Sequence, residues 1–384
     1  MKKKIVFVIT DYGSFNNFIG EVAVELSRLG NDVYLISSLQ KVINIDDKFD
    51  YKVEGIKFFP VELPRGFNPI KHYKASKRIN KIIDSINPDV VSIHFTTGIF
   101  TTTFNGKLKY KTVGTFHGLG FPVVNGNLKK LIYKFVEKQS LERIDEAWVL
   151  NNYDLEIIKK EFPKINVNKI PTKGVGCDLK VFNSDNFDGK FRSYFREQLN
   201  INEIDFVIAF TGRFVNFKGF DKVIRAFKIL NEQEDVNHLK LILMGGEDKA
   251  HDHGLTEEEQ DWIKTNSNII NVGFTNEVAK YLKISDLLVF PSEKEGMPVC
   301  IIESLAMGIP VVTANARGCN DLITDNYNGI LLKNNTPTEI ARSIKLLMNN
   351  KELYEKFRAN ILNDRDELDR SNFVAQQVEY FRTF

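Results

Sequence analysis

Two carboxylates frame a short, largely apolar segment in the last third of the chain. Glu295 and Glu303 stand at the two ends of EGMPVCIIE, with a glycine and a proline between them. The segment predicts a helix over 297–306, with Pro298 in its first turn, where a missing N–H costs nothing. Glu303 then lies about 8–10 Å along the axis from the helix start. Carboxylates placed in this way do not share one proton, but they can bind two parts of one elongated ligand.

The groups around these carboxylates match the parts of such a ligand. A cis-diol such as ribose pairs with the two acceptor oxygens of one carboxylate, and a sugar hydroxyl pairs with the other. The backbone amides of Gly296 and Met297, at the predicted helix start, can meet phosphate or sugar oxygens. The alternatives are that Glu303 is a surface helix residue and that Met297 fills the core.

Two cations follow a predicted strand in the segment AFTGRFVNFKGF. Arg213 comes directly after Gly212 at the strand end, and Lys218 lies five residues on, in a loop that leads into a helix. Arginine offers a rigid fork for phosphate oxygens and lysine offers a point charge, so together they suit a diphosphate. The alternative is a solvated loop that carries two unpaired cations.

Two further candidates follow predicted strands in the first half. Gly13 stands between the first strand and the first helix, where a glycine lets backbone amides approach a phosphate. It can equally be an ordinary turn residue, and the missing G-x-G-x-x-G pattern argues against a nicotinamide dehydrogenase. His117 precedes Gly118 and Gly120 and is predicted at the rim of a cleft, although a lone histidine is often structural.

The elements that must position these residues alternate between strand and helix. Short β-branched runs predict strands at 5–10, 32–37, 56–61, 89–95, 111–117, 146–151, 205–212, 239–245, 269–273, 287–292, 310–314 and 329–332. Amphipathic runs predict helices at 17–29, 71–85, 221–232, 297–306 and 366–384. A loop rich in Gly, Asn and Asp at 175–192 separates two such series. We therefore expect two α/β, doubly wound, Rossmann-like domains, 1–172 and 173–365, in which ligands bind at the carboxyl ends of the strands.

Composition limits the function classes. The 384 residues include 43% hydrophobic and 27% charged residues, and the net charge of +2 gives no case for nucleic acid. Three scattered cysteines fit a reducing cytoplasm better than a disulfide framework. The first apolar run is too short for a signal peptide, and no apolar run is long enough to span a membrane. The sequence His251-Asp252-His253 lacks a third ligand in view, so we expect no metal and no cofactor.

A basic amphipathic stretch in the first half has no acidic residue from 65 to 83. Phe67, Ile70 and Tyr73 are interleaved with its cations, and a second basic stretch lies near Leu131 and Phe135. Such a stretch can bind an anionic membrane surface, or it can be a solvated helix face. The cations in question are Arg65, Lys71, Lys74, Lys77, Arg78, Lys81, Lys129, Lys130 and Lys134.

The chain resembles the bacterial retaining glycosyltransferases of family 4, which have the glycosyltransferase B fold. The motifs that carry the resemblance are Glu295-x7-Glu303, Gly212-Arg213 and Lys218-Gly219, within 206–328, and the likeness extends more weakly over the rest. The resemblance implies that a nucleotide-sugar donor binds in a central cleft between the two domains. It also implies that the final helix, 366–384, crosses back onto the first domain.

The resemblance assigns a role to each candidate. Arg213 and Lys218 would hold the donor diphosphate, Glu295 would contact the transferred sugar, and Glu303 would bind the ribose. His117 would lie beside the donor sugar. Gly13 would lie near the diphosphate, although the family's paired glycine is replaced here by Tyr12.

We therefore expect a cytoplasmic retaining glycosyltransferase, peripheral on the inner membrane face. It would move a sugar from a UDP-sugar to a hydroxyl of a surface glycan, such as a polysaccharide or lipopolysaccharide, or of a lipid-linked acceptor. UDP is the nucleotide that the family favours. Two alternatives remain open: a sugar-nucleotide epimerase on the same fold, and a non-catalytic glycan- or lipid-binding protein. The epimerase would not depend on an acceptor. The intact set of Arg213, Lys218, Glu295 and Glu303 argues against the binding protein.

Overall fold

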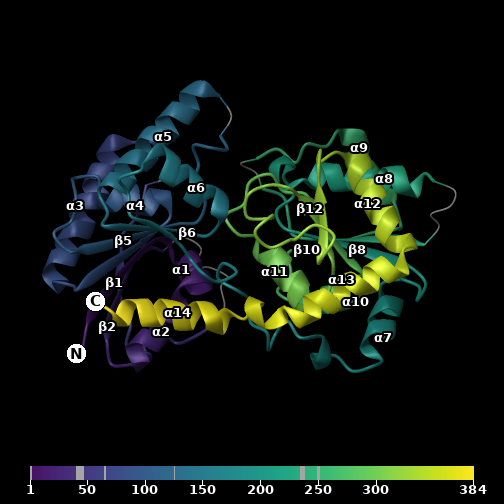
Figure 1. Cartoon of the computed structure of the whole chain (residues 1–384), viewed down its shortest axis with the longest axis horizontal. Helices are drawn as coiled ribbons and strands as arrows, with labels where there is room; N and C mark the ends of the chain where they lie inside the picture. The colour runs from purple at the N-terminus through teal and green to yellow at the C-terminus, as the bar shows by residue number, and fades with distance from the viewer. Residues whose placement is uncertain (1, 40–46, 65, 125, 234–237, 249–250) are drawn as a thin grey trace. The chain divides into compact units, whose positions relative to one another are not determined.

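A computed structural model describes residues 2–39, 47–64, 66–124, 126–233, 238–248 and 251–384. The chain divides into two compact units (Figure 1). The first comprises Met1–Val175 and Ser371–Phe384, and the second comprises Gly176–Arg370. The sequence analysis placed residues 173–175 in the second domain and residues 366–370, as part of the final helix, on the first domain. The structure places 173–175 in the first unit and 366–370 in the second. Each unit is a parallel sheet with helices on both faces, so the two-domain, Rossmann-like α/β fold is confirmed.

The first unit contains a parallel sheet of seven described strands in the order β3-β2-β1-β4-β5-β6-β7. Its strands are β1 Lys4–Asp11, β2 Asp32–Ser38, β3 Lys57–Pro60, β4 Val90–His94, β5 Lys111–Phe116, β6 Glu146–Val149 and β7 Val167–Lys169. Its helices are α1 Tyr12–Phe18, α2 Gly20–Arg28, α3 Pro69–Ile86, α4 Thr96–Thr102, α5 Asn127–Glu142, α6 Asn152–Glu161 and α14 Arg370–Arg382. Helices α3, α4 and α5 pack in sequence, and in Figure 1 they lie across the sheet from α14.

The second unit contains a parallel sheet of six described strands in the order β10-β9-β8-β11-β12-β13. Its strands are β8 Phe206–Thr211, β9 Leu239–Met244, β10 Ile269–Gly273, β11 Leu287–Phe290, β12 Val311–Ala314 and β13 Gly329–Leu332. Its helices are α7 Phe191–Gln198, α8 Phe220–Asn231, α9 Glu257–Thr265, α10 Val278–Ile284, α11 Val299–Ala306, α12 Pro337–Asn349 and α13 Lys351–Asn363. Three short 3-10 turns are η1 Ser184–Asn186, η2 Asn216–Lys218 and η3 Arg365–Leu368.

Both sheets are apolar on both faces, which explains why their strands read as continuous hydrophobic runs. In β1 the side chains from Ile5 to Ile9 are fully buried, and those of β11 are almost completely buried. Parallel strands covered by helices on two sides produce this pattern, whereas a half-exposed strand would alternate. The order of each sheet reverses once, between β1 and β4 and between β8 and β11. In such sheets a ligand binds beside the reversal.

Several predicted helix bounds are wrong. The helix predicted over 17–29 is two helices, interrupted at Ile19, and the first of them already begins at Tyr12. The tail predicted as one helix over 366–384 begins with η3, and α14 follows it. Helix α7 occupies part of the segment predicted as a loop. The predicted helix over 297–306 begins only at Val299, because Pro298 takes the extended N-cap conformation.

Helix α14 packs within the first unit. The Phe381 ring meets Phe7 of β1 edge-on at 5.6 Å between centroids, and the Tyr380 ring meets Trp148 of β6 at 4.9 Å. Tyr380 also donates a hydrogen bond to the Glu146 carboxylate at 2.6 Å. Helix α14 therefore covers strands of the first sheet. The chain leaves this unit after residue 175 and returns to it with this last helix.

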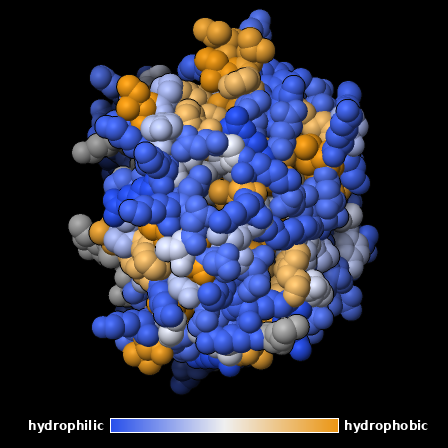
Figure 2. Space-filling model, turned by 90° about the vertical axis from the view of Figure 1, so that its left-hand side faces the viewer, coloured by the Kyte–Doolittle hydropathy of each residue, from blue (hydrophilic) through white to orange (hydrophobic). Residues whose placement is uncertain are grey.

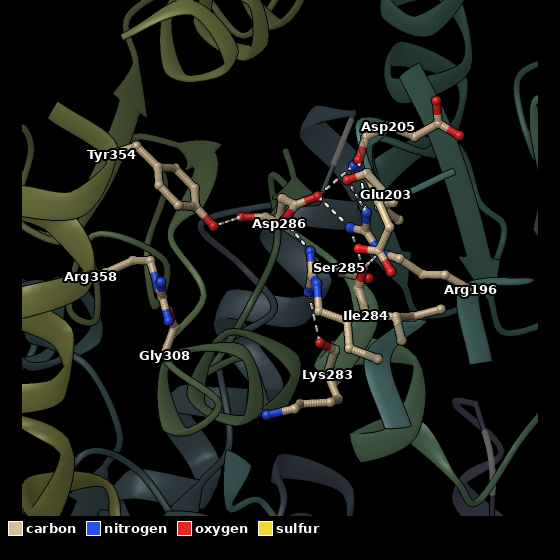
Figure 3. A network of polar contacts seen from close by, with 12 residues as sticks. Arg196, Glu203, Asp205, Lys283, Ile284, Ser285, Asp286, Gly308, Tyr354 and Arg358 are labelled. Atoms are coloured by element: carbon tan, nitrogen blue, oxygen red, sulfur yellow. Dashed lines mark hydrogen bonds and ion pairs between the residues drawn. The ribbon is translucent and has the colours of Figure 1, made fainter. Parts of the chain in front are cut away.

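A buried ion pair fixes the amino ends of the two central strands of the second sheet (Figure 3). The guanidinium of Arg196, a buried side chain of α7, donates to the Asp286 carboxylate at 2.8 Å and to the Ile284 carbonyl at 2.8 Å. Asp286 directly precedes β11, and the same carboxylate accepts the backbone N–H of Val207 in β8 at 2.8 Å. This network sets the alignment of β8 with β11, and hence where their carboxyl ends, and the loops that follow, lie.

Candidate active site

The strongest candidate site is at the strand-order reversal of the second sheet. Two loops leave the carboxyl ends of neighbouring strands there, 212–219 after β8 and 291–298 after β11. We call them the switch-point loops. They contain every predicted donor residue of this unit except Glu303, which lies on α11 immediately after the second loop.

Lys218 and Glu295 join the two loops in an ion pair. The Lys218 ammonium contacts the Glu295 carboxylate, and the two side chains are only 16% and 10% exposed. Ser292 donates a second hydrogen bond to the same carboxylate oxygen at 2.6 Å. The ammonium also lies 5.6 Å from the centre of the Phe290 ring. A partly buried, charge-assisted pair of this kind holds both groups in one geometry.

Arg213 also has a carboxylate partner. Its guanidinium forms an ion pair with Asp248 and lies over the Phe217 ring, 5.5 Å from the centroid, while half of the side chain stays exposed. The carbonyl of Phe217 accepts hydrogen bonds from the Ser292 hydroxyl at 3.2 Å and from the Glu293 N–H at 3.0 Å. The loop that carries Arg213 is therefore tied to the loop that carries Glu295. Arg213 and Lys218 each have a carboxylate partner, whereas the solvated-loop alternative would leave both cations unpaired.

Close backbone approach explains two glycines at this site. Gly219 has φ 78°, and a Cβ built on it would lie 2.6 Å from the Pro291 carbonyl oxygen. Gly318, after β12, has φ 77°, and its Cβ would lie 2.7 Å from the Gly296 carbonyl oxygen. A side chain at either position would be strained and would push the loops apart. The glycines thus let three loops meet around Glu295.

Glu303 lies on α11, eight residues after Glu295 of the preceding loop. Burial and the negative charges of Glu295 and Glu303 together raise the pKa of the Cys300 thiol well above its usual value. Cys300 belongs to the first turn of α11, so both carboxylates flank this helix start. Gly296 and Met297 are half-buried in the turn before the helix. Met297 also packs against the core of the unit, so the core interpretation of this residue holds in part.

His117 follows β5 in the first unit and sits among other rings. It stacks on Phe95 with centroids 4.2 Å apart, and its Nε2 lies 3.2 Å from Nδ1 of His94. Burial lowers the pKa of His117 to about 3, so the ring is neutral at physiological pH. Its other nitrogen, Nδ1, is buried and has no hydrogen-bond partner among the described residues.

Comparison with known families assigns the chain. The profile of the family "Glycosyl transferase 4-like" matches residues 4–149, and that of "Glycosyl transferases group 1" matches residues 191–364. The chain belongs to the family 4 glycosyltransferases. The matched segments cover most of both units of this glycosyltransferase, and the second contains the switch-point loops.

The glycosyltransferase is similar to proteins of known name over most of its length. It is 26% identical over 294 residues (74% of this chain, 73% of the relative) to a UDP-Gal:alpha-D-GlcNAc-diphosphoundecaprenol alpha-1,3-galactosyltransferase of Escherichia coli. It is 25% identical over 349 residues (88% of each chain) to an N,N'-diacetylbacillosaminyl-diphospho-undecaprenol alpha-1,3-N-acetylgalactosaminyltransferase of Campylobacter jejuni. The structure of Anabaena HepE in complex with UDP-glucose matches the whole chain with a TM-score of 0.75 at 15% identity, and both chains are covered completely.

The predicted phosphate-binding role of Gly13 is weakened by its surroundings. Gly13 does not lie in a loop before a helix but inside the first turn of the short helix α1. The backbone N–H of Ser14 already donates to the Asp11 carboxylate at 2.9 Å. The Ser14 N–H, which the glycine would open to a phosphate, is thus already hydrogen-bonded, and the Asp11 carboxylate beside it is negatively charged. Contact between Gly13 and a diphosphate stays a prediction.

The loop after His117 is held by two buried carboxylates that the sequence analysis did not identify. Glu137 of α5 accepts the N–H of Gly120 at 2.6 Å and that of Phe121 at 3.1 Å. Asp154 of α6 accepts the N–H of Leu119 at 3.1 Å. Burial raises the pKa of Glu137 to about 7. An acidic residue in an otherwise apolar helix face was the only sequence feature that could have drawn attention to Glu137.

The basic residues lie on two neighbouring helix surfaces of the first unit. Lys71, Lys74, Lys77, Arg78 and Lys81 are on α3, and Lys129, Lys130 and Lys134 are on α5, while Arg65 lies outside the described residues. A cavity of about 550 Å³ beside α3 is lined by Lys71, Lys74 and Arg78 together with Glu62 and apolar residues.

Large apolar side chains are exposed next to these cations, and Figure 2 shows an apolar cluster that projects at the top of this face, at the height of α5 in Figure 1. The exposed residues are Phe67, Ile70, Tyr73, Leu128, Leu131, Ile132 and Phe135. The Phe67 and Tyr133 rings meet at 5.5 Å, so the segment before α3 and the middle of α5 are in contact, and we call the exposed side of these two helices the α3–α5 surface.

Neither a membrane span nor a metal cluster is found in the described part of the chain. Across the described ranges no helix is long and apolar enough to cross a bilayer. The same ranges hold no group of three or more His, Cys, Asp and Glu side chains that could bind a metal. His251 instead lies 3.2 Å from Asp248, the partner of Arg213.

Proposed function

We propose that this glycosyltransferase transfers a hexosyl or N-acetylhexosaminyl group from a UDP-sugar to a hydroxyl of a lipid-linked or surface glycan, with retention of configuration. The observation that carries the proposal is the joined pair of Lys218 and Glu295 at the strand-order reversal, with Arg213 in the same loops. The E. coli relative is named for a UDP-galactose donor and a diphosphoundecaprenol-linked acceptor, which supports both ends of the reaction.

Each part of the donor has a matching group. Arg213 and Lys218 would neutralise the diphosphate, and their positive charge stabilises the leaving group as the glycosidic bond breaks. Glu295 would bind hydroxyls of the transferred sugar, and its contact with Lys218 places sugar and phosphate side by side. Glu303, near the start of the same helix, would bind the ribose diol. Both ends of the donor are thereby fixed relative to α11.

We propose front-face attack by the acceptor hydroxyl. Glu295 is engaged by Lys218 and Ser292, so it is poorly placed to serve as a carboxylate nucleophile. The acceptor oxygen would attack the anomeric carbon on the side from which the UDP oxygen leaves. The departing phosphate would take the hydroxyl proton, which balances the step without a further base. His117, a neutral ring directly after β5, would lie beside the donor sugar.

The two cations supply the charge that this leaving group needs, so we propose that the reaction requires no divalent metal and no cofactor. Activity is therefore expected to persist in EDTA. Loss of activity in EDTA and its recovery with manganese would contradict this part of the proposal.

The α3–α5 surface supports a peripheral position on the inner face of the cytoplasmic membrane. Its cations would attract anionic lipid, about 1 kcal/mol for each that reaches the surface, and its exposed apolar side chains would enter the interface. The first unit would then meet a lipid-linked acceptor at the bilayer.

Donor turnover measured with and without an acceptor tests the proposal against its alternatives. A transferase releases UDP in step with acceptor and forms a product whose anomeric configuration matches the donor, as NMR can show. An epimerase would change the donor sugar without any acceptor, and a binding protein would do neither. A thermal-shift screen of nucleotide sugars would identify the donor before the assay.

A further inference from the structure

The first unit contains a small pocket that the roles proposed so far do not use. Its volume is about 280 Å³, and it lies between the starts of α3 and α4, the middle of α5 and the loop after β5. This volume lies just below the usual range for ligand sites, about 300–1,000 Å³, so the pocket can hold one ring rather than a nucleotide sugar. Its walls come from the carboxyl ends of β4 and β5, the edge at which α/β sheets bind ligands.

The lining is aromatic and hydroxylic. Five of the residues that line it carry aromatic rings, namely Phe67, His72, Phe95, Phe100 and Tyr133. Hydroxyls come from Thr96, Thr97 and Tyr133, and Glu137 adds a buried carboxylate. None of the described lining residues is a lysine or an arginine. Apolar ring faces combined with a few polar groups suit a neutral ring that has both C–H faces and hydroxyls, and they do not suit a phosphate.

Strain in the pocket wall points to a function. Phe95 has φ 67° and ψ 146°, a conformation that bulky side chains rarely adopt and that costs about 1–3 kcal/mol. In this conformation its ring stacks on His117 and also lines the pocket. The Phe95 ring, which forms part of the pocket wall, is therefore packed directly against the His117 ring, which is proposed to lie beside the donor sugar.

A buried carboxylate fixes the rest of the wall. Glu137, completely buried, accepts the Thr96 hydroxyl at 3.2 Å and the Gly120 N–H at 2.6 Å. A Cβ built on Gly120 would lie 2.5 Å from the Tyr133 ring, so only glycine lets this loop approach α5 so closely. The pocket is thus shaped by contacts that β4, β5 and α5 make with one another.

We propose that this pocket binds the acceptor's sugar, a single neutral pyranose ring, next to His117. The inference rests on the proposed transferase function, because it assigns one of the two substrates of that reaction. Phe67 and Tyr133 both line the pocket. Phe67 belongs to the α3–α5 surface, and Tyr133 contacts Phe67. An acceptor sugar on a lipid would therefore enter from the side that is proposed to face the bilayer.

Saturation-transfer NMR on the full chain tests the assignment. The probes are the methyl α-glycosides of glucose, galactose, N-acetylglucosamine and N-acetylgalactosamine. We expect at least one of them to bind the wild type. Phe100→Leu, which removes a ring, and Thr97→Val, which removes a hydroxyl, are each expected to weaken that binding by about 2- to 10-fold. Phe104→Leu is the matched control, because the Phe104 ring touches Phe100 and His72 but does not line the pocket.

The outcomes separate this inference from the proposed function. The pocket assignment is overturned if no glycoside binds the wild type, or if a glycoside binds Phe100→Leu, Thr97→Val and the wild type equally. UDP affinity, measured by calorimetry on the same proteins, reports the proposed donor site, whose groups Arg213, Lys218 and Glu303 belong to the second unit. Unchanged UDP affinity together with lost glycoside binding is the expected result. Failure of the wild type to bind UDP would contradict the transferase proposal instead.

Discussion

The Lys218 ammonium contacts the Glu295 carboxylate across two neighbouring loops of the second unit. The cation proposed for the leaving group and the acid proposed for the sugar are thus one coupled pair. Breaking a partly buried pair by removing one partner leaves the other charge without compensation. Each single change should therefore impair both donor binding and turnover.

Lys218→Ala is expected to lower turnover about 10²-fold or more, because it removes charge stabilisation from the leaving group. Lys222 provides a matched control. It lies on α8, directly after the first switch-point loop, and pairs with Glu293 of the second loop at 2.5 Å, but Glu293 is 48% exposed. Lys222→Ala is expected to cost less than about 1 kcal/mol of stability, because solvent screens an exposed pair. Steady-state kinetics and thermal unfolding of the two variants provide the comparison, and equal turnover for both would contradict the assignment.

Arg213→Lys is expected to be impaired although it keeps the positive charge. The planar fork that binds two phosphate oxygens is lost, and a lysine cannot replace both contacts. The measurement is kcat at saturating donor, together with inhibition by UDP. Wild-type values for both would show that Arg213 does not touch the diphosphate.

Glu303→Ala is expected to lower UDP affinity at least several-fold, since a hydrogen bond to a charged group contributes about 1.5–3 kcal/mol. The same carboxylate offers an independent test of position. Because its negative charge helps to raise the pKa of Cys300, Glu303→Gln should lower that pKa and speed alkylation of Cys300 by iodoacetamide at pH 8. Mass spectrometry can locate the modified thiol. Unchanged alkylation would show that the Glu303 charge does not act on the Cys300 thiol.

Glu137 gives a pH dependence of stability with a defined sign. Burial raises the pKa of Glu137 from 4.5 to about 7 in the folded protein, so the folded state binds the proton more tightly than the unfolded state. The stability from this group is present below about pH 4.5 and is lost as the pH rises through about 7. Glu137→Gln cannot titrate, so its melting temperature relative to wild type should rise between pH 5 and pH 8. A constant difference over that interval would contradict the assigned pKa.

Flotation with liposomes tests the α3–α5 surface. The wild type is expected to float with anionic vesicles at low salt and to be released at high salt, since the charges act over about 10 Å at 0.1 M. Replacement of Lys74, Lys77, Arg78 and Lys81 by serine should abolish flotation. The control replaces four exposed cations of the second unit, Lys333, Arg342, Lys351 and Lys356. A serine variant that still floats, or a wild type that does not, would favour a soluble saccharide acceptor.

The sequence predicted what depends on local pattern. Buried parallel strands produce continuous apolar runs, so every predicted strand overlaps one in the structure, and the polar residues that follow them were found. Partners distant in the chain could not be predicted. Asp248 meets Arg213 only because β8 and β9 are adjacent, and Glu137 meets Gly120 only because α5 folds back onto the loop after β5. The ring pair of His94 and His117 likewise requires β4 beside β5. The first residue of a helix, such as Val299, depends on the geometry of the N-cap. A proline near the start of a helix defines that first residue only to within one or two positions.

Calorimetric titration with UDP tests the central claim most directly, namely that the switch-point loops form the donor site. Wild type and Lys222→Ala are predicted to bind UDP with similar affinity. Lys218→Ala and Glu303→Ala, folded to the same melting profile, are predicted to bind at least several-fold more weakly. Equal UDP affinity in all four proteins, or no binding to the wild type, would contradict the account.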